Sequence, residues 1–288
     1  MAFVVELSAY SYVLLISSSL AAGAINAVAG GGTVLTFPAL LAAGVAPITA
    51  NATSTISLVI GSFTSAYGYR SEVGEARRLM GWMTIPSLIG GLIGAGLLLH
   101  LGDSSFKKLV PWLILGATCL FLIQEPISRT IKARAAKAAE SDQSSVEDPP
   151  IGVPAPAHDP NNPVGAPLAA ALFFQLLVAI YGGFFGAGIG ILQLASLGFL
   201  GLTNIHRMNA VKTMTSSFIN LVATITFIIA GRVDWKIAGI MTIGAVVGGY
   251  GGAGLARKVG QATVRKTVIA IGFGIAALMF YRQTHGGM

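Results

Sequence analysis

The sequence predicts an all-α polytopic membrane protein made of two pseudo-symmetric repeats, and three observations support this fold class. Of the 288 residues, 54% are hydrophobic and only 10% are charged, which is too apolar for an ordinary soluble domain. The longest apolar runs approach or exceed ~18 residues, the length at which a helix crosses a bilayer. The second half of the chain also matches the first, without a gap, after a shift of 158 positions.

The internal repeat is visible in glycine and polar residues that recur at this one spacing. Matched pairs include Gly30 and Gly188, Gly32 and Gly190, Asn51 and Asn209, Thr55 and Thr213, Gly90 and Gly248, and Gly94 and Gly252. Many membrane transporters are built from two repeats that hold the substrate between them. The last two pairs also form small-xxx-small patterns, which let membrane helices pack closely.

Eight long apolar segments predict transmembrane helices, four in each half. They are 10–28, 48–69, 80–100 and 109–124, then 167–187, 207–230, 237–256 and 265–282. Two shorter segments, 33–46 and 189–202, each follow a glycine cluster. With 14 residues apiece they are too short for an ordinary crossing, so each is expected to be a half-helix, a re-entrant segment or a strained crossing. Pro38 predicts a break within the first of them.

The chain divides into a first membrane repeat at 1–124, a linker at 125–166 and a second membrane repeat at 167–288. The linker begins basic and then becomes acidic and proline-rich, which predicts a largely disordered tether. By the positive-inside rule the linker is cytoplasmic, whether or not the short segments cross the membrane. If they do cross, the two halves are inverted, and the distribution of Lys and Arg favours that arrangement.

Asp, Glu and His are missing from the predicted membrane interior. Every Asp, Glu and His lies in a loop, the linker, a tail or near a helix end. Carboxylates and imidazoles are the usual proton relays and cation ligands inside membranes, so the pattern disfavours a metal-ion pump. No HExxH motif or Cys/His cluster is present, and we expect neither a metal site nor a cofactor. No histidine is placed to activate a buried serine, so we predict that the chain is not an enzyme.

The net charge of +7 comes from Lys and Arg in short loops beside apolar runs. No basic stripe is interleaved with aromatic residues. This distribution is typical of membrane topology, and nucleic acid is not an expected partner.

The polar groups that remain inside are hydroxyls, amides and glycine turns, which together suggest an anion site. The glycine turns open one helix in each half, and the asparagines open the next helix or lie in its first turn. Helix N-termini present unpaired N–H groups and a positive dipole end, which bind anions. We expect one wall of the site to contain Gly30, Gly31, Gly32, Asn51 and Thr55, and the other to contain Gly188, Gly190, Asn209, Lys212 and Thr213.

Lys212 is the sharpest candidate, because it stands where the first half has Ser54 and would supply a cation. Simpler interpretations remain open. Asn51 and Asn209 would serve equally well as helix caps, and Lys212 would reach the membrane interface by snorkelling.

The glycine and asparagine motifs resemble those of the sulfite exporter TauE/SafE family. In the first half the motifs are Asn26-Ala-Val-Ala-Gly-Gly-Gly32, Phe37-Pro38 and Asn51-Ala-Thr-Ser-Thr55. In the second half they are Gly182-Gly-Phe-Phe-Gly-Ala-Gly-Ile-Gly190 and Asn209-Ala-Val-Lys-Thr213. The resemblance covers essentially the whole chain outside the linker, with one departure: Ser196 stands where the first half has Pro38. It implies a permease of the bacterial inner membrane that moves small sulfur oxyanions or organosulfonates outward.

The expected function is therefore secondary transport of a small anion such as sulfite or sulfoacetate, without direct use of nucleotide because no Walker motif is present. Rocking of the two halves would alternate access to the site. The expected partners are the anion and the lipid bilayer, and a homo-oligomer remains open. The alternatives are a passive anion channel and a membrane scaffold whose linker binds partners.

Overall fold

The computed structural model describes residues 7–28, 31–68, 77–144, 166–200, 202, 205–259 and 261–285. These residues form ten helices and contain no strand, which confirms the all-α class. The helices are α1 (Ala9–Val28), α2 (Thr33–Ala42), α3 (Pro47–Gly68), α5 (Arg77–Leu101), α6 (Asp103–Ser144), α7 (Ala166–Phe184), α8 (Ile189–Phe199), α9 (Ile205–Ile229), α10 (Trp235–Val259) and α11 (Gln261–Thr284).

Five of the described helices are long and apolar enough to cross a membrane: α1, α5, α6, α9 and α11. Their outward faces carry large apolar side chains, and on α5 Trp82, Ile85 and Leu92 are at least half exposed. Such a surface would be unfavourable in water and is typical of contact with lipid. The chain is a multi-pass membrane protein.

The two short helices, α2 and α8, have 10 and 11 residues. At ~1.5 Å per residue each covers about half of a bilayer's hydrocarbon core. Each follows a glycine in the left-handed region, Gly31 with φ 101° and Gly188 with φ 79°. The predicted break at Pro38 is wrong, because Pro38 lies inside a continuous α2. A proline at this point removes a single backbone donor, and the packed half-helix tolerates that loss.

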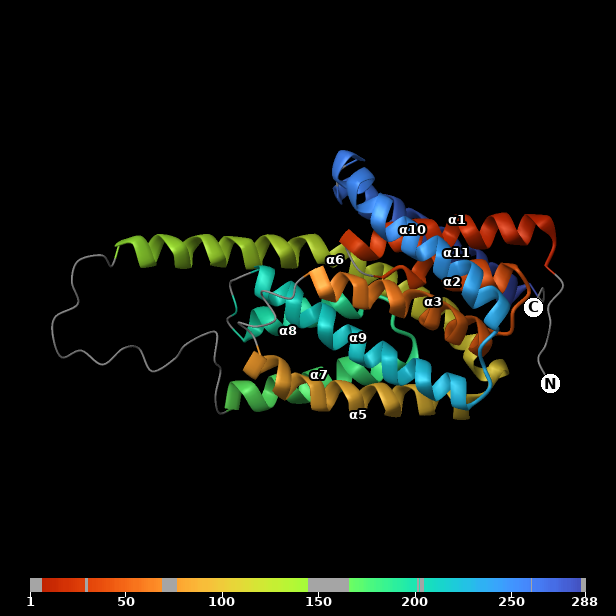
Figure 1. The fold of residues 1–288 in the computed structure, drawn as a ribbon, viewed down its shortest axis with the longest axis horizontal. Helices are drawn as coiled ribbons and strands as arrows, with labels where there is room; N and C mark the ends of the chain where they lie inside the picture. Colours follow the sequence, from red (N-terminus) through yellow and green to blue (C-terminus); the bar gives the residue numbers. More distant parts are fainter. Residues whose placement is uncertain are drawn as a thin grey trace.

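The described helices follow the order of the sequence repeat. Helices α3, α5 and α6 are described from 47, 77 and 103, and α9, α10 and α11 from 205, 235 and 261. In Figure 1, α1 begins at the end of the bundle where both chain termini lie, whereas α7 begins at the opposite end, from which α6 projects. We call these ends the termini side and the linker side.

Glycines bring together helix pairs that join the two halves. Along the bundle α1 packs against α10 and α5 against α7 (Figure 1). A Cβ at Gly94 would overlap the carbonyl oxygen of Ile180, and one at Gly248 would overlap that of Leu20. A Cβ at Gly90 would likewise collide with α7. The predicted packing function of these three glycines is confirmed, and Gly252 lies beyond the residues whose surroundings are described.

Helix α6 is longer than its membrane span. It continues past Pro126 to Ser144, and this end projects from the bundle in Figure 1. The described part of the predicted linker, 125–144, is therefore helical, and 145–165 lies outside the described residues.

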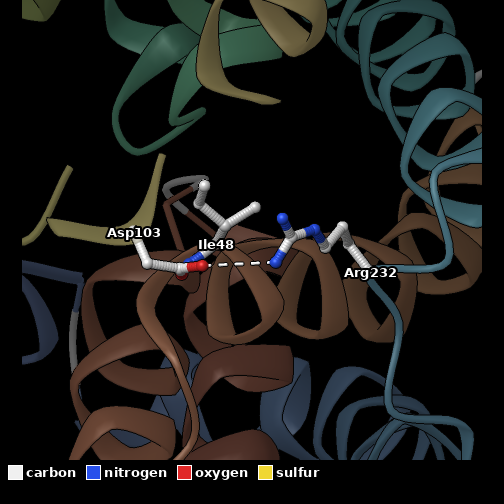
Figure 2. A network of polar contacts seen from close by, with 3 residues as sticks. All are labelled: Ile48, Asp103 and Arg232. Carbon is white, nitrogen blue, oxygen red and sulfur yellow. Dashed lines mark hydrogen bonds and ion pairs between the residues drawn. The ribbon is translucent and has the colours of Figure 1, made fainter. Parts of the chain in front are cut away.

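A polar network on the termini side joins three helix ends (Figure 2). The Ile48 N–H donates to Asp103 Oδ1 over 2.9 Å, and Arg232 Nη1 donates to Asp103 Oδ2 over 3.2 Å. Asp103 thus caps the start of α3 from the start of α6, and it holds the turn between α9 and α10. A carboxylate at a helix start also complements the helix dipole.

Replacing Asp103 by alanine is expected to lower the thermal midpoint by about 4 °C, since loss of a helix cap costs about 1 kcal/mol. Arg232→Gln is the matched control. It is expected to shift the midpoint by only about 1 °C, because partly exposed ion pairs contribute little. Thermal melting of the purified protein in detergent measures both. Equal effects of the two variants would show that the cap on α3 does not matter.

Candidate functional site

The first glycine turn is closed by a side chain of α1. The N–H groups of Gly31 and Gly32 donate to Asn26 Oδ1 over 2.9 and 3.3 Å. The start of α2 therefore already has a neutral acceptor from the protein. Gly30, the third predicted glycine of this turn, lies outside the described residues.

Asn51 does not cap a helix. It is the fifth residue of α3, whose first turn receives Asp103 instead, and Asn209 is likewise the fifth residue of α9. The cap interpretation of both asparagines is wrong for the same reason: each lies inside the helix, past the residues that carry the unpaired N–H groups. The sequence placed the two helix starts at 48 and 207, whereas the helices begin at 47 and 205. This difference moves both asparagines out of the first turn.

Asn51 instead reaches from the first half to the end of α7. It is 1% exposed, and its Nδ2 donates to the Phe184 carbonyl over 3.3 Å. Because a carbonyl only accepts, this bond fixes the orientation of the amide and leaves Oδ1 on the other side. Among the described residues Oδ1 is buried without a hydrogen-bond partner. Leaving a buried acceptor unpaired costs about 1–3 kcal/mol, so packing alone does not favour an asparagine here.

The second glycine turn, between α7 and α8, is held by a side-chain hydrogen bond, and no side chain caps the helix that follows it. The Tyr181 hydroxyl donates to the Ala187 carbonyl over 2.7 Å and holds the turn in place. No side chain caps α8 at Gly188, and within the described residues the N–H groups of Ile189 and Gly190 have no acceptor. In the first turn Asn26 accepts from Gly31 and Gly32, whereas here two successive N–H groups have no acceptor among the described residues.

Lys212 lies beside these donors. Its aliphatic stem packs on Gly190, where an added Cβ would lie 3.3 Å from Lys212 Cδ. None of the ion pairs formed by the described residues involves Lys212. A cation next to the positive end of α8 is repelled by it, and an anion between the two relieves that repulsion. This position favours anion binding over snorkelling.

The corresponding residue in the first half, Ser54, has a hydrogen-bond partner within the protein. Ser54, which Lys212 replaces, is fully buried and shares a 2.6 Å hydrogen bond with Thr36. The residue 158 positions after Thr36 is Leu194, which offers no hydrogen-bonding group. The two halves have thus diverged, and the second half exchanges a closed hydroxyl pair for an unpaired ammonium group.

The two glycine turns meet on one turn of α6. A Cβ at Gly31 would overlap the Phe121 ring, and one at Gly188 would lie 3.3 Å from Leu120 Cδ1. Asn51 and Lys212 approach the α7–α8 turn at Phe184 and Gly190, its two ends. The structure therefore gathers Gly31, Gly188, Gly190, Asn51 and Lys212 around α6 and the α7–α8 turn.

The predicted threonines and Asn209 contribute less. The Thr55 hydroxyl donates to the Asn51 carbonyl over 2.8 Å, so it satisfies its own helix. Asn209 and Thr213 lie partly buried on α9, close in sequence to Lys212.

The polar residues that join α8 to α9 form a closed network. Gln193 Nε2 donates to Thr215 Oγ1 over 3.0 Å, and Ser216 Oγ donates to Gln193 Oε1 over 2.6 Å.

Tyr181 was missed by the sequence reasoning because its repeat counterpart is Gly23, so the comparison of matched positions gave no signal there.

The comparisons with known proteins agree with this architecture. The family model for the sulfite exporter TauE/SafE matches residues 15–279. The chain belongs to the sulfite exporter TauE/SafE family. This is a family of transporters rather than enzymes, and no group of three or more potential metal ligands occurs among the described residues.

Curated relatives carry transporter names without a substrate. A "probable membrane transporter protein" of Haemophilus influenzae is 26% identical over 264 residues, covering 90% of each chain. The "probable membrane transporter protein YfcA" of Escherichia coli K12 is 26% identical and covers 92% of this chain and 87% of its own length. A "probable membrane transporter protein ORF9" of Sinorhizobium is 24% identical over 97% of this chain. No solved structure matches.

Proposed function

We propose that this TauE/SafE protein is a secondary transporter that exports a small sulfur oxyanion or organosulfonate, such as sulfite or sulfoacetate. The observation that carries the proposal is Lys212, which has no carboxylate partner in the described residues and packs beside the uncapped start of α8. The family supplies the substrate class, and this geometry supports a small anion. A bacterial inner membrane and a cytoplasmic linker follow from the same family and from the positive-inside rule.

The proposed architecture has eight long transmembrane helices, two half-helices and inverted repeats. The matching order of α3, α5 and α6 and of α9, α10 and α11 supports the repeats. Their inversion is supported by the opposite directions of α1 and α7 in Figure 1. In such transporters the substrate lies where broken helices of the two repeats meet, and rocking of one repeat against the other alternates access.

The proposed substrate form is a protonated monoanion. A single ammonium group, that of Lys212, neutralises one negative charge. The buried Asn51 Oδ1 is satisfied by a ligand that carries a hydrogen-bond donor, such as hydrogen sulfite. Asn51 approaches the same α7–α8 turn as Lys212. Transport of a protonated anion would move a proton without a buried carboxylate.

A flux assay with purified protein in proteoliposomes tests this function. The panel contains sulfite, sulfoacetate, sulfate and chloride. Each anion is offered with and without an opposing concentration gradient of the same anion. We expect accumulation of a sulfur oxyanion or organosulfonate against its gradient, which a passive channel does not produce. A scaffold would give no flux for any anion. Deletion of 145–163 should leave the flux unchanged if the linker is only a tether.

Replacing Gly190 by alanine is expected to raise the half-saturating substrate concentration about fivefold, an effect of about 1 kcal/mol. The new Cβ would lie 3.3 Å from Lys212 Cδ and displace the flexible lysine without moving the backbone. Gly239→Ala is the matched control, because a Cβ there meets no atom within 4 Å. If the half-saturating concentration changes fivefold in both variants, or in neither, Gly190 has no specific effect on substrate binding.

A further inference from the structure

A cavity of about 750 Å³ lies on the termini side, between α1, α2 and α11. Its walls are mainly apolar, with Leu14 and Ala21 from α1, Leu35 from α2, and Ile271 and Leu278 from α11. None of the ten predicted site residues lines it. The volume lies in the range of about 300–1,000 Å³ that holds drug-sized molecules, which is far larger than a small oxyanion requires.

Two cations, Lys107 of α6 and Arg282 of α11, line the same cavity. They lie at one level, because the neighbouring Gln283 Nε2 donates to the Lys108 carbonyl over 3.4 Å and joins the two helices there. The ion pairs formed by the described residues include neither Lys107 nor Arg282.

The carboxylates whose side chains are described are engaged elsewhere. Asp103 holds Arg232 and the start of α3, and Glu125 pairs with Arg129. Asp234 accepts the Ile237 N–H at the start of α10. The positive charge at the cavity is therefore not neutralised by any of these groups.

Aromatic residues place the cations at the membrane surface. Trp112 of α6 is 62% exposed, and its ring contacts Phe280 of α11 at 4.9 Å. Exposed tryptophan on a membrane helix is typical of the headgroup level. Deeper in the cavity, the hydroxyls of Ser17 and Ser18 donate to the carbonyls of Leu14 and Leu15. Their protons are used within α1, so the deep part of the cavity suits a hydrocarbon chain.

We propose that this cavity binds an anionic phospholipid, with its phosphate at Lys107 and Arg282 and one acyl chain between α1, α2 and α11. Charge complementarity selects the headgroup, and the apolar lining selects the chain. If the linker is cytoplasmic, the termini side faces the outer leaflet, where the positive-inside rule expects few basic residues. A bound anion would account for the two that line the cavity. The acyl chain would pack on Leu35 and Pro38 and support the half-helix α2. The proposal is independent of the transported substrate.

The experiment measures thermal midpoints of purified full-length protein in a neutral detergent. Phosphatidylglycerol, phosphatidylcholine and inorganic phosphate are added separately. Phosphatidylglycerol is expected to raise the midpoint by about 5 °C, and the other two by about 1 °C or less. Equal shifts with the two lipids would overturn the selection of an anionic head. An equal shift with phosphate would reduce the site to a surface anion site and overturn the proposal.

Two variants test whether the lipid binds in this cavity. The double variant Lys107→Gln/Arg282→Gln should lose the phosphatidylglycerol shift, whereas Lys108→Gln should keep it, because Lys108 is exposed and does not line the cavity. Ala42→Trp fills the cavity from an exposed position of α2 and should also abolish the shift with both cations present. A full shift in either cavity variant would overturn the proposal.

Discussion

Replacing Lys212 by glutamine is expected to reduce the export of sulfur oxyanion about 30- to 100-fold. Hydrogen bonds to charged groups contribute about 1.5–3 kcal/mol, and here the lysine side chain packs on Gly190 at the uncapped start of α8. Initial rates of labelled sulfite transport in proteoliposomes measure the effect. The thermal midpoint should not fall, because the variant removes a cation from beside a positive helix end.

The matched control for this variant is Lys266→Gln, which removes the same charge from an exposed position of α11. It should leave the flux within about twofold of wild type, since exposed charges act weakly through screening solvent. Lys212→Arg keeps the charge and should retain more flux than Lys212→Gln. Wild-type flux in Lys212→Gln would mean that Lys212 only reaches the interface and that the anion binds elsewhere.

The order of the helices and most of their bounds followed from the sequence because apolar runs and glycine turns are local signals. The exception is α6, which runs on to Ser144, beyond the predicted 109–124. The repeat also drew attention to Lys212, since one lysine interrupts an otherwise matched pattern. These features need no knowledge of which helices touch. The same holds for Gly90, Gly94 and Gly248, whose spacing alone indicated close packing.

The helix starts were harder to predict because their partners come from distant parts of the chain. Asp103 caps α3 from 55 residues away, and Asn51 bonds to a carbonyl 133 residues away. No local pattern indicates either contact. The sequence therefore suggested positive helix starts in both halves. In the structure Asn26 accepts from the turn before α2 and Asp103 accepts at the start of α3, whereas no side chain caps α8.

Replacing Gly94 by valine is expected to lower the thermal midpoint by about 10 °C or to prevent folding. Its Cβ would overlap the Ile180 carbonyl and press on the Phe184 amide, and neither backbone atom can move aside as a side chain would. Overpacking commonly costs about 1–3 kcal/mol, and clashes with backbone lie at the upper end. Melting curves and size-exclusion profiles of the purified variants measure the loss.

Gly96→Val, two residues along the same helix, is the matched control, because a Cβ at Gly96 meets no atom within 4 Å. It should fold with a midpoint within about 2 °C of wild type, since valine is not worse than glycine in a helix. Gly248→Val should behave like Gly94→Val, because its Cβ would overlap the Leu20 carbonyl of α1 in the corresponding helix pair. If only one of the two glycine variants destabilises the protein, the α1–α10 and α5–α7 contacts are not equivalent. The two halves would then be joined chiefly by one pair, and symmetric rocking of the repeats would lose its structural basis.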